Sequence, residues 1–404
     1  MDNKEINELK RFFLVTPLGL EQLAAQELVF WHKEAKDLEE LKGGVEFTST
    51  FAKACELNTC LKVPSRILLR LTDFRCRDFP KLFQKIQKIK WGGLLNSKHM
   101  DIVTSVHKSR INNRKRVQLT VFEALQKSKD ASLKLEDIKP QKLFIRFFND
   151  QCFVSVDLSG DHLHQRGYKT FSTDAPIREN LAAAMVYEMF GSKNWTQAAE
   201  DIGKIKLIDP MCGSGTLLLE AAQLFTKNKL RPYGCDKMLT AEQLEKPGVF
   251  EESTYQWAGL EGYDISDKSI EASHQNLANT QNVSLRKLIK FQEQDIFKAD
   301  EIENNEAKPP DGKPLEKDTT VQRNWVICNP PYGERIKTEG LRNNDFHWLI
   351  MQIIKKYSPE NIGILLPVKN VRGLKPIKAY KRRTKNFENG GLKVSFLILQ
   401  KKAP

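Results

Sequence analysis

The sequence lacks the features that would place it in a membrane or carry it through one. No apolar run approaches the roughly 20 residues of a membrane-spanning helix. The first residues, Met1 to Glu5, are charged, and no apolar stretch of a secretory signal follows them. The seven cysteines are odd in number, whereas disulfide frameworks usually have an even number. They also include no Cys-x-x-Cys pair, which is the usual spacing in zinc sites. We therefore expect a cytoplasmic protein with free thiols and no bound metal.

The charged residues are unbalanced in favour of cations. The 404 residues include 64 Lys and Arg against 51 Asp and Glu, a formal net charge of +13, and 40% of the chain is hydrophobic. This length and hydrophobic content predict two or three domains with proper cores. The excess of cations favours a polyanionic partner, most simply nucleic acid, although solubility alone would also account for it.

The most informative stretch joins a predicted strand, Lys204 to Ile208, to a predicted helix, Thr216 to Leu224. Two glycines in the turn between them allow the backbone to approach a ligand closely. Strand, glycine turn and helix together predict a nucleotide-type site at the carboxyl end of the strand, with an empty strand-to-helix turn as the alternative. No Gly-Lys-Ser/Thr follows, which excludes a phosphate-binding P-loop. The residues expected at this site are Asp209, Pro210, Gly213 and Gly215.

A second motif, Asn329-Pro-Pro-Tyr332, follows the predicted strand from Asn324 to Cys328. The exocyclic amine of guanine or adenine is a poor nucleophile because its lone pair is delocalised into the ring. The amide oxygen of Asn329 and the carbonyl of Pro330 can accept both amine hydrogens, which favours a pyramidal, more reactive nitrogen. Pro330 and Pro331 hold the loop extended, and Tyr332 can stack on an extruded base. A plain Pro-Pro turn is the alternative.

Two further carboxylates follow predicted strands. Asp264 closes the strand from Gly259 to Tyr263, where a carboxylate can accept hydrogen bonds from the ribose hydroxyls of a nucleoside cofactor. Its distance from the glycine turn exceeds the usual spacing of about 20 residues. Asp295 ends the strand from Ile289 to Gln294, and forming a turn would explain it equally well.

The N-terminal half contains strands and helices but no residues that look catalytic. Its predicted strands are Arg11 to Thr16, Gly44 to Phe47, Ser65 to Leu71, Met100 to His107, Lys142 to Phe148 and Cys152 to Leu158, and its predicted helices are Leu20 to Leu28, Phe51 to Leu57, Phe79 to Ile89 and Asn113 to Gln126. The last helix begins with a cluster of cations, which opposes the helix dipole unless an anion binds there. An ordinary solvated basic face is the alternative. The candidate RNA contacts are Arg110, Arg114, Lys115 and Arg116.

The C-terminal part adds three expectations. Pro176, with Asp174 as its cap, predicts the start of a helix that runs to Phe190. A turn from Phe387 to Gly391 and a last strand from Leu392 to Leu399 predict a terminal hairpin. The basic run from Arg372 to Lys385 before it could bind an RNA backbone or protect the hairpin edge by its charge.

The glycine turn resembles motif I of class I S-adenosylmethionine-dependent methyltransferases. The resemblance implies that Gly213 and Gly215 make room for the methionyl part of the cofactor and that Asp209 faces its ammonium group. It also implies that Asp295 pairs with the adenine amino group. Residues 73–160 resemble a THUMP domain, an RNA-binding module, through Arg77-Asp-Phe-Pro-Lys-Leu-Phe83, Trp91 and Val156-Asp-Leu-Ser-Gly160.

Three stretches, Asp157-Leu-Ser-Gly160, Arg166-Gly-Tyr168 and Ala175 to Ala183, resemble the bacterial ribosomal RNA large-subunit methyltransferase L family, which methylates guanine N2. This resemblance implies a ferredoxin-like domain (1–72), a THUMP domain (73–160) and a class I, Rossmann-like methyltransferase domain (161–404). The last domain would have a seven-stranded, mostly parallel sheet. The resemblance also implies that Glu179 and Asn180 lie near the methionine end of the cofactor.

Taken together, the sequence predicts an S-adenosylmethionine-dependent RNA methyltransferase that modifies guanine N2 in 23S ribosomal RNA. Transfer would be direct, without a metal or a covalent enzyme intermediate. The alternatives are guanine-N2 methylation of transfer RNA, adenine-N6 methylation of nucleic acid, and a non-catalytic RNA-binding assembly factor.

Overall fold

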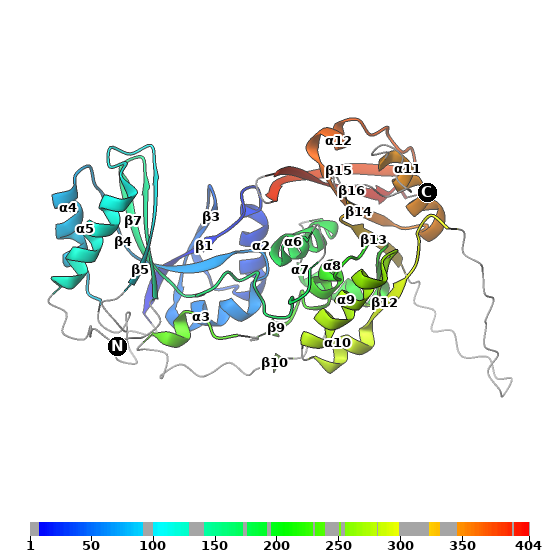
Figure 1. The fold of residues 1–404 in the computed structure, drawn as a ribbon, viewed down its shortest axis with the longest axis horizontal. Coiled ribbons are helices and arrows are strands. Elements are labelled where there is room, and N and C mark those ends of the chain that lie inside the picture. The colour runs from blue at the N-terminus through cyan, green and yellow to red at the C-terminus, as the bar shows by residue number, and fades with distance from the viewer. Residues whose placement is uncertain are drawn as a thin grey trace. The chain divides into compact units, whose positions relative to one another are not determined.

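The computed structural model describes residues 8–91, 100–128, 141–172, 176–191, 195–228, 231–238, 250–251, 255–280, 282–298, 323–331, 346–389 and 392–403. They form two compact units. The first comprises Met1–Arg166 and Thr226–Glu252, and the second comprises Gly167–Phe225 and Ser253–Pro404 (Figure 1). The division into three domains stays a prediction.

The first unit is built on a seven-stranded sheet in the order β2-β3-β1-β4-β7-β6-β5, in which only β5 and β6 pair in parallel. Its strands are β1 (Leu9–Val15), β2 (Lys36–Leu41), β3 (Gly44–Thr50), β4 (Arg66–Arg75), β5 (Met100–His107), β6 (Gln141–Phe148) and β7 (Gln151–Asp157). Its helices are α2 (Glu21–Trp31), α3 (Phe51–Cys60), α4 (Phe79–Gln87) and α5 (Arg114–Gln126), with a short ladder of β9 (Lys227–Asn228) and β10 (Phe250–Glu251) and the 3-10 helix η2 (Cys235–Lys237). The boundary expected after residue 72 falls inside β4, so both expected N-terminal domains share one sheet.

Local sequence signals explain most of these elements. Asn113 caps α5, because its side chain accepts a hydrogen bond from the backbone of Arg116. Asn149 and Asp150 form the turn between β6 and β7 with positive φ angles of 50° and 62°, as hairpin turns require. The strand β2 escaped prediction because its Lys36–Leu41 sequence is mostly charged and lies exposed at the sheet edge. An edge strand of this kind carries no alternation of apolar residues.

The second unit holds another seven-stranded sheet, in the order β12-β11-β8-β13-β14-β16-β15. Its strands are β8 (Ile205–Asp209), β11 (Gly259–Asp264), β12 (Ile289–Glu293), β13 (Arg323–Cys328), β14 (Asn361–Pro367), β15 (Tyr380–Asn389) and β16 (Leu392–Lys401). The first five pair in parallel, whereas β16 is antiparallel to both of its neighbours. The expected α/β class with a mostly parallel seven-stranded sheet is therefore confirmed.

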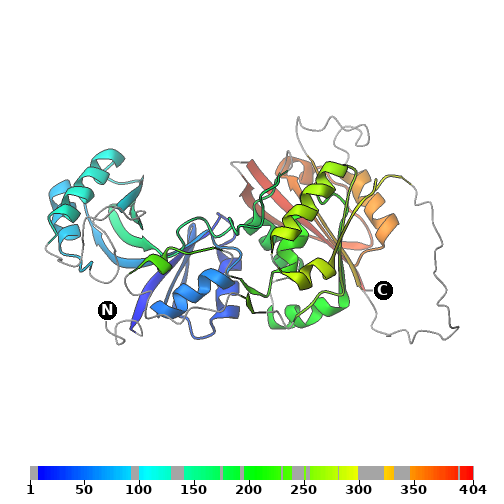
Figure 2. The same cartoon turned by 60° about the horizontal axis from the view of Figure 1, so that its bottom comes forward.

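Helices cover both faces of this second sheet (Figure 2). They are α6 (Glu179–Met189), α7 (Trp195–Asp201), η1 (Ile202–Lys204), α8 (Thr216–Ala222), α9 (Asp267–Asn279), α10 (Val283–Leu288), α11 (Phe346–Tyr357) and α12 (Val368–Arg372). On one face, Val326 of β13 packs in a cluster with residues of α11 and α12. On the other face, its neighbour Trp325 contacts Phe190, which follows α6, with ring centroids 4.9 Å apart.

Two local predictions in this unit were wrong. The helix α6 begins at Glu179 instead of Pro176, and its N-cap, Arg178, makes no side-chain capping bond. The carbonyl of Ile177 accepts a hydrogen bond from Lys169 Nζ at 2.6 Å, which ties down the extended segment before the helix. Asp174, the expected cap, lies outside the described residues.

The second error concerns the start of the turn in the terminal hairpin, whose two antiparallel strands are confirmed. Residues expected to turn from Phe387 onward continue β15 as far as Asn389. Phe387 is buried and pairs with Val394 across the ladder, so burial of this ring extends the strand beyond the point where the polar sequence suggested a turn.

Candidate active site

The candidate active site lies where β11, β8 and β13 end side by side. Gly262 pairs with Asp209 between β11 and β8, and Val326 pairs with Ile208 between β13 and β8. Because these strands are parallel, Asp264 and Asn329 extend beyond Asp209 at the same edge of the sheet, one on each side of it. The structure thus brings together three residues that the sequence predicted separately, at the edge where parallel sheets bind ligands.

Asp209 occupies the centre of this edge and is only 1% exposed. Its Oδ1 accepts a hydrogen bond from the backbone N–H of Met211 at 3.1 Å. Its Oδ2 is buried and has no hydrogen-bond partner among the described residues. Burial, with a smaller contribution from the nearby Asp264 carboxylate, raises the pKa of Asp209 well above that of an ordinary carboxyl group. A buried oxygen in this state fits a cationic ligand group, such as the ammonium of an amino acid moiety.

The glycine turn beside Asp209 is held by the end of β11. Cys212 N–H donates to the Tyr263 carbonyl at 2.8 Å, and Gly213 N–H donates to Asp264 Oδ2 at 2.9 Å. The other oxygen of Asp264 accepts from the backbone N–H of Ser266 at 3.0 Å. Asp264 therefore shapes the turn as well as facing the site edge. Each carboxylate oxygen can accept more than one hydrogen bond, so these backbone bonds leave capacity for ribose hydroxyls. The contact of Asp264 with a ribose stays a prediction.

Gly215 is required by packing as well as by the turn. It adopts a φ of 78°, and a Cβ at this position would come within 2.7 Å of the Phe291 ring on β12 and 3.1 Å of Ser273 on α9. A larger residue would push α8 away from these neighbours. The close approach explains this glycine without a ligand, whereas Gly213, with a φ of 53°, presents its N–H to Asp264.

A buried asparagine on α9, Asn276, was missed by sequence reasoning. Its Oδ1 accepts from the backbone N–H groups of Thr170 and Phe171, both at 3.1 Å. Its Nδ2 donates to the Phe171 carbonyl at 2.9 Å and to the Ser214 carbonyl in the glycine turn at 3.1 Å. Asn276 therefore connects the segment before α6 to the glycine turn. The one available signal was a polar residue next to Leu277 on the buried side of the helix.

Two neighbours in the same segment, Tyr168 and Lys169, contact α8 and the residues just before α6. Tyr168 donates its hydroxyl to Glu220 Oε1 on α8 at 2.6 Å. Burial lowers the pKa of Lys169, while the carboxylates of Glu179 and Glu220 act in the opposite direction. These contacts fix the approach to α6, on which Glu179 and Asn180 are buried. The predicted contact of these two residues with a cofactor stays a prediction.

The remaining predicted residues of this edge lie as follows. Asp295 is half-buried, and its Oδ1 accepts from the backbone N–H of Phe297 at 2.9 Å, as a turn-forming aspartate does. Asn329 and Pro331 are half-buried and Pro330 is buried. Tyr332 lies outside the described residues.

Cysteine chemistry does not explain this site. All seven cysteines are buried free thiols, as expected. Burial, together with nearby carboxylates, raises the pKa of Cys212 and of Cys328 well above the usual value for a thiol. A thiol that resists ionisation is a poor nucleophile. Within the described ranges, no group of three His, Cys, Asp or Glu side chains could hold a metal ion.

The predicted RNA contacts of the first unit are exposed at the start of α5. The guanidinium of Arg116 lies 4.2 Å from the centre of the Phe79 ring. The backbone N–H of Arg110 donates to Asp150 Oδ1 at 2.8 Å, and Arg77 Nε donates to the other oxygen of Asp150 at 2.7 Å. Arg114 and Lys115 project from the same helix start, and their contact with RNA stays a prediction.

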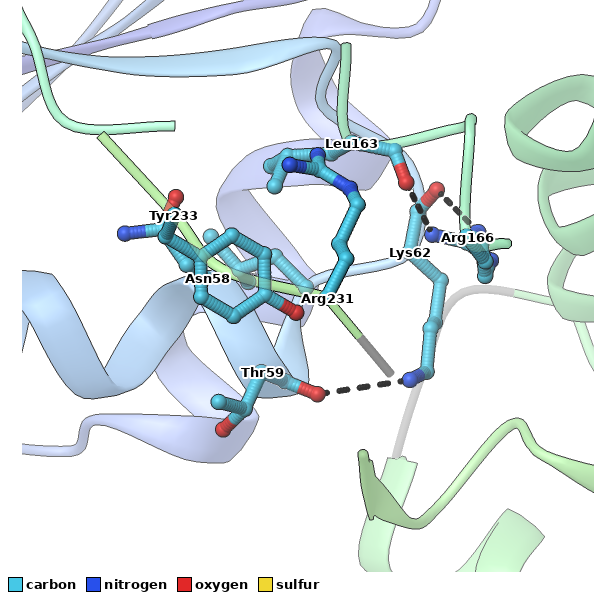
Figure 3. A pocket seen from close by; sticks show the side chains of 8 residues that line it. Asn58, Thr59, Lys62, Leu163, Arg166, Arg231 and Tyr233 are labelled. Atoms are coloured by element: carbon cyan, nitrogen blue, oxygen red, sulfur yellow. Dashed lines mark hydrogen bonds between the residues drawn. The ribbon is translucent and has the colours of Figure 1, made fainter. Parts of the chain in front are cut away.

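The first unit also contains a small pocket that involves none of the predicted site residues (Figure 3). It is lined by Asn58, Thr59, Leu61, Lys62, Leu163, Arg166, Arg231 and Tyr233. The guanidinium of Arg166 donates to the carbonyls of Leu163 and Lys62, both at 2.9 Å. That of Arg231 donates to several carbonyls, including Ser159 at 3.1 Å. These cations therefore hold loops of the unit together.

In the described part of the chain, no helix is long and apolar enough to cross a membrane.

Comparison with known proteins agrees with this architecture. Residues 166–393 match the family described as "RMKL-like, methyltransferase domain", and residues 11–68 match the "RlmL ferredoxin-like domain". Two curated relatives are named "Ribosomal RNA large subunit methyltransferase K/L". The protein from Syntrophotalea carbinolica is 29% identical over 345 residues, which is 81% of this chain and 45% of the relative. The protein from Methylococcus capsulatus is 31% identical over 352 residues, which is 80% of this chain and 42% of the relative. The chain thus spans less than half the length of these relatives.

Solved structures share the fold over nearly the whole chain. A possible methylase from Clostridium difficile 630 superposes with a TM-score of 0.74 at 23% identity, over 98% of this chain and 99% of the other. SMU.472, solved in complex with SAH, superposes with a TM-score of 0.70 at 21% identity, with the same two coverages.

Proposed function

Because the chain belongs to the RMKL-like methyltransferase domain family, we propose that it transfers a methyl group from S-adenosylmethionine to a guanine N2 amine in 23S ribosomal RNA. The observation that carries the proposal is the buried, unpaired oxygen of Asp209 beside a braced glycine turn, one strand away from Asn329-Pro-Pro. The names of the curated relatives support ribosomal RNA as the substrate, and the SAH complex of SMU.472 supports the cofactor.

In this proposal the residues of the glycine turn bind and orient the cofactor. Asp209 holds its ammonium group, and Gly213 leaves room for the methionyl chain. Asp264 adds contacts to the ribose, and Asp295 to the adenine amino group. When bound, the cofactor supplies an electrophilic methyl group on a sulfonium centre. Much of the rate then comes from holding the acceptor amine in line with that methyl group.

The loop after β13 prepares the amine. The amide oxygen of Asn329 and the carbonyl of Pro330 accept its two hydrogens, and Tyr332 stacks on the guanine base. Accepting both hydrogens directs the nitrogen lone pair toward the methyl group and stabilises the positive charge that develops on the amine. Preorganised acceptors of this kind typically contribute about 10²–10³ in rate.

The first unit captures RNA, with residues 73–160 acting as a THUMP domain. The cations at the start of α5 supply contacts to phosphates that carry no sequence information. We place the reaction in the cytoplasm, where ribosomal RNA is made and modified.

The test is methyl transfer in vitro followed by mass spectrometry of nucleosides. The purified protein is incubated with labelled S-adenosylmethionine and one nucleic acid in each reaction: protein-free ribosomal RNA, transfer RNA or DNA. We expect N2-methylguanosine in 23S ribosomal RNA alone. N2-methylguanosine in transfer RNA would change the substrate, and N6-methyladenine would overturn the assignment of the amine. Absence of transfer to every substrate would favour a non-catalytic RNA-binding factor.

A further inference from the structure

A dense run of cations on the second unit has no role in the site described so far. From Val368 to Phe387 the chain contains eight Lys and Arg residues and no Asp or Glu. The run includes α12, the loop after it and most of β15, which lie close together beside α11 (Figure 1).

Three of these cations bind groups of the protein itself. Arg383 Nη1 donates to Glu188 Oε2 at 2.8 Å, and Lys385 Nζ lies 3.6 Å from the other oxygen of that carboxylate. Arg382 Nη2 donates to the Val371 carbonyl at 2.6 Å. The other five are exposed and form no ion pair with an acid of the described chain: Lys369, Arg372, Lys375, Lys378 and Lys381.

Protection of the sheet edge explains only part of this set. β15 is the last strand of the sheet, and lysines on an edge strand discourage pairing with other chains. Lys381 lies on that strand and needs no other explanation. Lys369, Arg372, Lys375 and Lys378 precede the strand, on α12 and the following loop, where they protect no backbone edge.

The helix that carries the first two of these cations begins next to the Asn-Pro-Pro loop. Cys328 pairs with Ile364 between the parallel strands β13 and β14. Pro331 and Pro367 are each three residues further on, so both lie just beyond the carboxyl ends of these two strands. α12 begins directly after Pro367 and therefore stands beside the proposed catalytic loop.

The backbone under these cations is firmly held. Val371 is 4% exposed and packs in the cluster with α11, and Leu374 packs against the same cluster. Arg382 fixes the end of α12 from β15 through the Val371 carbonyl. The backbone that carries these cations therefore loses little conformational entropy when they bind a polyanion.

We propose that Lys369, Arg372 and Lys375 bind the RNA phosphates that flank the target guanine. The inference rests on the proposed function, since it assigns the backbone contacts of the same substrate. When a base is extruded into the proposed active site, its neighbouring phosphates lie at the entrance of that site. Cations on the adjacent strand end neutralise those phosphates and fix the position of the nucleotide, without reading its sequence.

The experiment compares two triple variants with the same change in charge. The surface variant carries Lys369→Gln, Arg372→Gln and Lys375→Gln. The control variant carries Lys204→Gln, Lys287→Gln and Lys290→Gln, three exposed cations of the same unit at the amino ends of β8 and β12. Affinity for a 23S ribosomal RNA transcript is measured from low to high KCl, together with SAH affinity.

We expect the surface variant to lower the slope of log affinity against log salt by up to about two units, as the loss of three contacts to single-stranded phosphates predicts. SAH affinity should stay near wild type, which also shows that the variant is folded. The control variant should keep the wild-type slope. Equal slopes in the two variants would overturn the inference while leaving the proposed function intact, because wild-type protein would still methylate the RNA. Wild-type protein that methylates no RNA would overturn both.

Discussion

Replacing Asp209 by asparagine should produce two effects of opposite sign, both arising from one buried oxygen. Without ligand, Oδ2 of Asp209 has no partner, and an ionised carboxylate in that position is destabilising. Asparagine has the same shape, retains the acceptor for Met211 N–H and carries no charge. An unpaired buried amide still destabilises by about 1–3 kcal/mol. The buried carboxyl group of the wild type must either carry an unpaired charge or hold a proton that the unfolded chain releases, and at neutral pH this costs more. We expect a net gain of about 1 kcal/mol in the ligand-free protein at neutral pH.

This gain should depend on pH in a defined direction. The folded-state pKa of Asp209 is raised above its unfolded value of about 4, so the folded wild-type protein retains a proton that the unfolded chain releases. Wild-type stability relative to the variant is therefore greatest below pH 4 and falls as pH rises toward the raised pKa. Thermal unfolding of both proteins across this range, without ligand, measures the difference.

Cofactor binding should change in the opposite sense. Removing one partner of a buried ion pair typically costs about 3–5 kcal/mol, so the dissociation constant for SAH should rise roughly 10²–10³-fold in Asp209→Asn. In the wild type, an ammonium group that pairs with Asp209 lowers its pKa and expels any proton it holds. Calorimetry in buffers of different ionisation enthalpy should detect this release in the wild type and not in the variant.

Asp295→Asn is the matched control. Its carboxylate is half-buried and already accepts a hydrogen bond, so removing its charge should leave proton release unchanged. The reasoning about Asp209 is refuted if Asp209→Asn loses stability without ligand and binds SAH as tightly as the wild type.

Three further outcomes follow from the same contacts. Asn329→Ala should slow single-turnover methyl transfer by about 10²–10³ and change RNA and SAH affinity far less, since its contribution belongs to the transition state; a near wild-type rate would remove it from the site. Asn276→Asp replaces the donor to the Ser214 carbonyl by a carboxylate and should weaken SAH binding. Among the described residues, the Asn279 side chain bonds only to Tyr168 and Thr170 in the segment before α6, so Asn279→Asp should leave SAH binding unchanged. Equal losses in the two variants would contradict a specific role of Asn276 in the glycine turn. Alanine at all of residues 114–116 should lower the salt dependence of RNA binding by about two to three units without altering SAH affinity; an unchanged slope would identify these cations as an ordinary solvated face.

Sequence patterns predicted three strand ends that the structure places side by side, because the determinants of these strand ends are local. Asp209, Asp264 and Asn329 each follow a short apolar strand directly, and parallel pairing is enough to bring such positions to one edge. The glycine turn is likewise encoded within a few residues. Such features require only that neighbouring strands pair in parallel.

The contacts that brace the site could not be predicted in this way. Asn276 acts on residues more than one hundred positions away in the chain, and a single polar residue in a helix does not indicate its partners. Arg382 was part of an undivided basic run until the structure separated the cations that bind the protein from those that remain exposed. The start of α6 was misplaced because the bond from Lys169 to Ile177 overrides the local signal of a proline.

The braces on the glycine turn also determine how the cofactor should bind. Glycine loses more backbone freedom than any other residue when it becomes ordered, so a loose turn would weaken binding by requiring the ligand to order it. Here, bonds from Tyr263, Asp264 and Asn276 restrict the turn before any ligand arrives. The cofactor should therefore bind to a preorganised turn, and hydrogen exchange of the turn amides should already be slow in the ligand-free protein.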